Sequence, residues 1–222
     1  AVGQFLARNS PDGLFRRYAR GRANGFAMRQ TMTVIGALTI AVLGSVPLGM
    51  LAAGLALLGE AVECLVLLRL SQSYAVRPVT LFARLIATAV ALVQATTIAG
   101  CVALCWRLIP LTEARFFAAA FLMAAGINAG LVRRYFPAAA HARLFVYAVT
   151  GLTMLGYDIA AGVGFGSWFF LVAVGIMGYT TTLFIAAVER GHSERLRFEK
   201  ALLAEQAELQ SSRQALAEAA RK

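Results

Sequence analysis

The sequence predicts an all-α integral membrane protein: six transmembrane helices followed by a C-terminal cytoplasmic coiled-coil helix. Of the 222 residues, 59% are hydrophobic and 14% are charged, and the mean hydropathy is +0.70, which is outside the usual range of soluble domains. Two apolar blocks, 31–70 and 81–188, are each longer than the roughly 20 residues that cross a bilayer. Residues 189–222 are charged and rich in strong helix formers.

Residues that end helices divide the two blocks into spans. Gly-Ser-Val-Pro at 44–47 breaks the first block into a hairpin. In the second block the breaks are the segment 106–110, which ends in proline, the arginine pair 133–134, and a glycine-rich turn around Gly162, Gly164 and Gly166. The six predicted spans are 28–45, 48–70, 79–105, 112–132, 140–157 and 167–188.

Arginines are unevenly distributed among the predicted loops. Most precede the first span, follow the last, or lie between spans two and three or four and five, whereas the opposite loops carry only Arg107 and Arg115. By the positive-inside rule, both termini are expected in the cytoplasm. The net charge of +10 is then mainly a topology signal. We therefore expect membrane lipids, and no nucleic acid, as partners.

Residues 1–27 form a basic segment before the first span, in which aromatic residues alternate with arginines. This pattern is typical of an amphipathic helix on an anionic leaflet. A partly disordered basic tail that only sets the topology is the alternative. No short apolar core with a cleavage site follows, so we do not expect a cleavable signal peptide.

Motifs for catalysis or cofactor binding are missing from the sequence. It has no nucleotide-binding loop, zinc motif or nucleophile elbow, so we assign no catalytic residue, no metal site and no cofactor to this chain. Cys64, Cys101 and Cys105 favour packing over metal binding, because a buried free cysteine behaves as a small hydrophobic residue.

Polar residues within the spans are the candidates for function, because an ionisable group at bilayer depth is costly. Glu60 and Glu63 lie one turn apart on the second span. One hypothesis places the pair inside the bundle, protonated, hydrogen-bonded to Gln94, Thr96 or Thr97, or sensing a cation or proton. The other has Glu63 reaching the cytoplasmic interface and Glu60 packed as a neutral acid.

Two further candidates are Asn128 and Asp158. Asn128 lies between Gly126 and Gly130, in a small-xxx-small pattern that allows close helix approach. Asp158 ends the fifth span near Phe165 and Trp168, where an external ligand or an interfacial aromatic belt is expected.

The tail 189–222 has one narrow apolar seam with a seven-residue period, formed by Phe198, Leu202, Leu209 and Leu216. Glu205 and Ser212 interrupt it, so the alternatives are a parallel homodimer or a solvated single helix. Gly191, between the sixth span and this helix, is a candidate hinge or a helix cap.

The chain resembles the membrane sensor and signalling-helix region of bacterial hybrid sensor histidine kinases. The resemblance is carried by the six spans and by the segments 194–200 and 212–222. It implies a sensory domain (28–188) in the bacterial inner membrane, followed by a signalling helix (189–222). This helix leads to a cytoplasmic output domain in cis, absent from this chain. With that domain, the full protein would be a phosphotransferase. The membrane module of a diguanylate cyclase is an alternative, as is a small transporter or assembly subunit with an oligomerisation coil.

The arginine distribution makes the topology testable. A reporter fused after Arg134 or after Lys222 is expected to read cytoplasmic, and one inserted near Pro110 external, because arginines are retained on the cytoplasmic side. A periplasmic reading after Lys222 would mean that the number of spans is odd.

Overall fold

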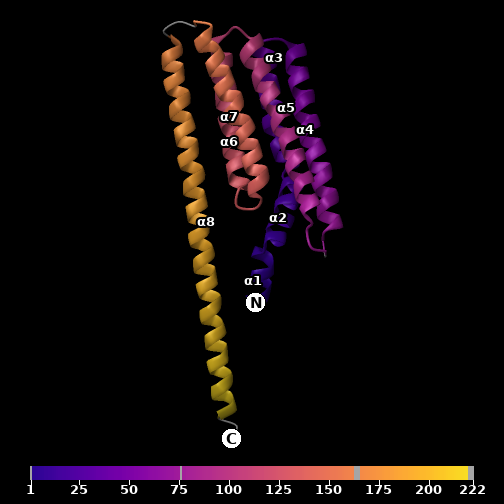
Figure 1. The fold of residues 1–222 in the computed structure, drawn as a ribbon, viewed down its shortest axis with the longest axis vertical. Helices are drawn as coiled ribbons and strands as arrows, with labels where there is room; N and C mark the ends of the chain where they lie inside the picture. The colour runs from indigo at the N-terminus through magenta and orange to yellow at the C-terminus, as the bar shows by residue number, and fades with distance from the viewer. Residues whose placement is uncertain (1, 76, 163–165, 220–222) are drawn as a thin grey trace.

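The computed structural model describes residues 2–75, 77–162 and 166–219, which form helices joined by short loops (Figure 1). The helices are α1 (Val2–Asn9), α2 (Pro11–Asn24), α3 (Phe26–Leu43), α4 (Val46–Ser73), α5 (Leu81–Leu108), α6 (Thr112–Val132), α7 (Pro137–Ala160) and α8 (Gly166–Ala219). Among these residues, the six helices from α3 to α8 are long and apolar enough to cross a membrane. The predicted all-α architecture with six candidate spans is confirmed to that extent.

Local sequence explains where the helices begin. The Ser45 hydroxyl accepts a hydrogen bond from the Leu48 amide (3.4 Å) and caps α4, so the break predicted at 44–47 separates α3 from α4. Thr80 caps α5 in the same way. Pro137 opens α7, where its missing amide hydrogen costs nothing. Gly162, after α7, has φ +66°, a conformation that favours glycine.

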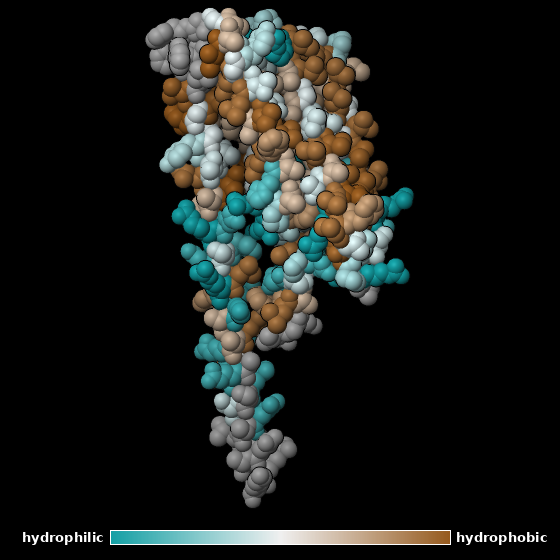
Figure 2. All heavy atoms as spheres, in the orientation of Figure 1, coloured by the Kyte–Doolittle hydropathy of each residue, from teal (hydrophilic) through white to brown (hydrophobic). Residues whose placement is uncertain are grey.

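Small residues let the central helices approach closely. Ala83, Ala87, Ala91 and Ala95 recur every four residues on one face of α5, and each is fully buried. This alanine stripe lies within the bundle, where α5 packs against α4 and α7. Large apolar side chains instead cover the outer faces of the helices, as Figure 2 shows for the upper part of the molecule.

Part of the N-terminal segment packs against the bundle. α2 is inserted into the lower end of the bundle, where Phe15 and Tyr18 are 1% exposed. Their rings pack around Phe136, with ring centroids 5.3 and 5.2 Å away. Phe15 and Tyr18 therefore pack inside the protein, on the same helix as Arg22, which also has its partners within the bundle.

α8 is set apart from the other helices. It lies beside α6 and continues well past the bundle, towards the end where α1 lies (Figure 1). Figure 2 shows hydrophilic residues where α8 leaves the bundle. Gly191 lies inside this continuous helix, so neither the predicted cap nor a break in the helix is observed there.

Candidate functional site

Glu60 and Glu63 are the centre of the candidate site. Their spacing on α4 places both carboxylates on the same face of the helix. That face is turned into the bundle, and the two residues are 4% and 0% exposed. Neither glutamate reaches an interface, so the alternative in which Glu63 extends to the cytoplasmic surface is wrong.

Arginines from three other helices surround the two carboxylates. Arg22 of α2 donates from Nη2 to Glu63 Oε2 at 2.6 Å and to both oxygens of Glu60 at 3.2 Å. Arg29 of α3 pairs through Nε with Glu60, and Arg143 of α7 pairs through Nη2 with Glu63. The carboxylates thus join α2, α3, α4 and α7.

A tyrosine completes the arrangement. The Tyr18 hydroxyl donates to Glu63 Oε1 (3.0 Å) and accepts from Arg143 Nη2 (3.1 Å). We call the following six residues the ion cluster: Tyr18, Arg22, Arg29, Glu60, Glu63 and Arg143.

Burial and charge set the protonation of the two α2 members. Burial raises the pKa of Tyr18 above its ordinary value, so the phenol keeps its proton and remains a donor. Burial alone would lower the pKa of Arg22, but the carboxylates of Glu63 and Glu60 outweigh it and raise that pKa. Arg22 is therefore a permanent cation at the centre of the site.

The predicted polar partners of the glutamates are replaced by these cations. Thr96 and Thr97 instead donate to carbonyls of their own helix, at Leu92 (2.9 Å) and Gln94 (2.8 Å). A threonine hydroxyl is readily satisfied in this way. Guanidinium groups supply both charge and several donors, which a buried carboxylate requires.

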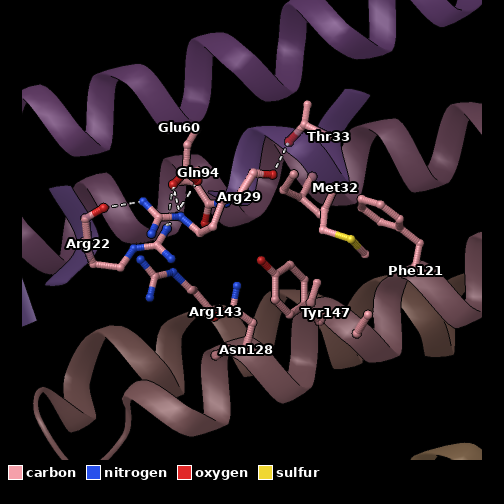
Figure 3. Close-up of a pocket in the computed structure, with 14 residues that line it drawn as sticks. Arg22, Arg29, Met32, Thr33, Glu60, Gln94, Phe121, Asn128, Arg143 and Tyr147 are labelled. Atoms are coloured by element: carbon pink, nitrogen blue, oxygen red, sulfur yellow. Dashed lines mark hydrogen bonds and ion pairs between the residues drawn. The ribbon is translucent and has the colours of Figure 1, made fainter. Parts of the chain in front are cut away.

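A cavity of about 120 Å³ adjoins the ion cluster (Figure 3). Two predicted candidates, Gln94 and Asn128, line it together with Arg22, Arg29 and Arg143. Its other lining residues are Met32, Thr33, Glu60, Ile98, Phe121, Ala124, Ala125, Ala129 and Tyr147. The structure thus brings together four of the five polar residues singled out in the sequence, three of them on the cavity wall and Glu63 behind it.

Asp158 belongs to a separate group. Its Oδ2 accepts from Trp106 Nε1 at 3.0 Å and lies 3.4 Å from Arg115 Nη1. At 9% exposure, the carboxylate has partners within the protein and joins α5, α6 and α7. Of the neighbours expected from sequence, Phe165 and the side chain of Trp168 lie outside the described residues.

Three of the four predicted seam residues lie on the surface of α8. Phe198, Leu202 and Leu209 are 71%, 45% and 53% exposed. The side chain of Leu216 lies outside the described part of the chain. The coiled coil itself stays a prediction.

The cysteines are dispersed. Cys101 and Cys105 donate to the carbonyls of Ala52 (3.2 Å) and Ala114 (3.5 Å). Within residues 2–75, 77–162 and 166–219, no group of three or more potential metal ligands gathers.

The arginines and the tyrosine are the site residues that sequence reasoning missed. The sequence held a signal for two of them, because Arg29 and Arg143 fall inside the predicted spans 28–45 and 140–157. An arginine within a span requires a counter-charge, and Glu60 and Glu63 were the candidates. Arg22 and Tyr18, in the segment before the spans, gave no such signal.

Comparisons with protein-family models, with curated proteins and with solved structures found no match for this chain.

Removing one buried carboxylate is expected to destabilise the fold. Glu63→Gln removes the carboxylate that pairs with Arg143 and leaves Arg22 with Glu60, at a cost of about 3–5 kcal/mol. Thermal unfolding in a neutral detergent measures the loss. Asp12→Asn is the matched control, because its partner Arg84 is 2.8 Å away but both side chains are about one-third exposed (35% and 31%). We expect that variant to lose at most about 1 kcal/mol. Equal losses in the two variants would contradict a structural role for the ion cluster.

Proposed function

We propose that this chain is the sensory and signal-transduction module of a bacterial receptor, the N-terminal part of a sensor histidine kinase. In this proposal α3 to α8 cross the inner membrane, both termini lie in the cytoplasm, and the stimulus acts on the helix bundle. The output domain would follow α8 in the full protein.

The observation that carries the proposal is the continuity of α8. A single helix of 54 residues runs from Gly166 to Ala219, which at about 1.5 Å per residue is roughly 80 Å. The hydrocarbon core of a bilayer is only about 30 Å thick. One continuous helix can therefore connect the bundle to a point far from the membrane.

α8 is attached to the bundle chiefly along α6. Gly130 of α6 faces Ile185, and a side chain at position 130 would collide with it. Close to this contact, Arg133 Nη1 lies 3.2 Å from Glu189 Oε2. Because α6 is the principal neighbour, a shift of α6 would pass to α8 as a rotation, piston movement or change of register.

Dimerisation supports the same function. The exposed apolar residues Phe198, Leu202 and Leu209 are covered if a second copy of α8 packs in parallel. A movement of α8 would then change the position of the two α8 helices relative to each other. In the resembled family, the dimerisation helix of the histidine kinase follows directly and would receive that change.

The seam can be tested by cross-linking in native membranes. A Leu209→Cys variant is expected to form a disulfide with its twin far more readily than Gln206→Cys or Arg213→Cys, because only position 209 lies on the seam. Non-reducing electrophoresis measures the dimer fraction. Equal cross-linking at the three positions would show that the seam is not the interface.

The signalling role can be tested in a fusion of residues 1–222 to the dimerisation and catalytic domains of a sensor kinase. A seven-residue helical insertion after Ser193 keeps the seam in phase, so autophosphorylation is expected to stay near that of the parent fusion. A two-residue insertion rotates the downstream helix by roughly 200° and is expected to change the rate of autophosphorylation several-fold. If both insertions leave autophosphorylation unchanged, α8 is only a tether and the proposed function fails.

A further inference from the structure

The ion cluster contains an excess of positive charge. Arg22, Arg29 and Arg143 contribute three cations, and Glu60 and Glu63 contribute two anions. Arg22 and Arg143 are only 6% and 2% exposed. A net positive charge in a buried site is costly unless an anion accompanies it.

The same arginines have N–H groups that lack an acceptor. Within the described part of the chain, Nε of Arg22 and both Nε and Nη1 of Arg143 are buried and without a hydrogen-bond partner. A buried charged donor left in this state carries the full cost of its desolvation. Both side chains line the cavity beside the cluster, so an anion placed there could accept from them.

The cavity is polar at one end and apolar at the other. Figure 3 shows the guanidinium groups of Arg22, Arg29 and Arg143 gathered on one side and Met32 and Phe121 on the other. The apolar end adjoins a second cavity of about 20 Å³, and the two share Thr33, Ile98 and Phe121 in their walls. The other residues of this second cavity are Gly36, Ala37, Ile40, Ala52, Ala56, Cys101, Val102, Cys105, Phe117 and Ala118.

We propose that this cavity binds an amphiphile with a singly charged anionic headgroup and an alkyl chain. The headgroup accepts from the free N–H groups of Arg143 and Arg22 and neutralises the excess charge of the ion cluster. The chain lies against Met32 and Phe121 and extends towards the second cavity. The inference rests on the proposed function, which places these helices in a membrane and makes the ligand the stimulus.

The walls of the cavity also connect the ligand to the signalling helix. Phe121, Ala125 and Asn128 belong to α6, the helix that holds α8 at Gly130. On the α3 side, Gly36 packs against Phe121, and Met32, one turn before Gly36, is 52% exposed. An amphiphile entering from the lipid between α3 and α6 would change the position of α6.

Direct binding tests the charge and the chain separately. Purified chain in nanodiscs of zwitterionic lipid is titrated with radiolabelled dodecanoate, and unlabelled dodecanoate, dodecanol and acetate are compared as competitors. Dodecanoate is expected to compete at least about tenfold better than either, because dodecanol lacks the charge and acetate lacks the chain. Equal competition by dodecanol and dodecanoate, or by acetate and dodecanoate, overturns the proposal.

Two variants locate the site. Arg143→Gln removes the excess charge and is expected to abolish the preference for dodecanoate over dodecanol. Because that change alters the ion cluster and can impair folding, Ala125→Leu is the second variant. It adds volume at a lining position outside the ion cluster and is expected to weaken dodecanoate binding at least about tenfold. Val149→Phe, which adds a similar volume at an exposed position of α7 that lines neither cavity, is expected to bind as the parent does. Unchanged binding in Ala125→Leu would overturn the assignment of the site.

A further arm distinguishes the two sources of such an anion. If phosphatidylglycerol added to the nanodiscs competes with dodecanoate, the ligand is a membrane lipid, and if it does not, the ligand is a free amphiphile. Either result retains the proposed chemistry. The binding assay does not depend on kinase activity. If the chain binds dodecanoate but the kinase fusion fails the insertion test, only the signalling role is refuted. A fusion that passes that test while the chain shows no charge-dependent binding refutes only the ligand.

Discussion

The pairing of Glu60 and Glu63 with buried arginines is the interaction on which the rest of the structure depends. It joins α4 to α2, α3 and α7. Removing either carboxylate leaves an arginine without its carboxylate partner, so the helices are coupled strongly through this point. The same pairing draws α2 into the bundle and forms the polar wall of the cavity.

The helices could be predicted where hydropathy and helix-ending residues agree. Ser45 and Pro137 act locally on the backbone, so α4 and α7 begin close to their predicted positions. The path of α8 through Gly191 could not be inferred in this way. Glycine within a helix costs only about 1 kcal/mol, and the strong helix formers that follow offset it. The burial of α2 was missed because an amphipathic pattern is the same whether its apolar face meets lipid or protein.

The candidate site was more predictable in its acids than in its bases. Glu60 and Glu63 are conspicuous in an apolar span, whereas Arg22 and Arg143 had another explanation as topology signals. These two arginines lie 41 and 80 residues from Glu63 in the chain, and no local periodicity encodes so distant a contact. Asp158 is similar, since its partner Trp106 is 52 residues away.

The order of the charges along the chain has a consequence for synthesis. Arg22 and Arg29 are made before Glu60 and Glu63, so cations are present when the acidic helix α4 emerges from the ribosome. Arg143 is made last, and until α7 arrives Glu63 has Arg22 as its one arginine partner. A nascent chain that ends within α6 also lacks Phe136, around which the aromatic rings of α2 pack. α2 would therefore pack into the bundle late. In unfinished chains its aromatic face would be exposed to chaperones and proteases.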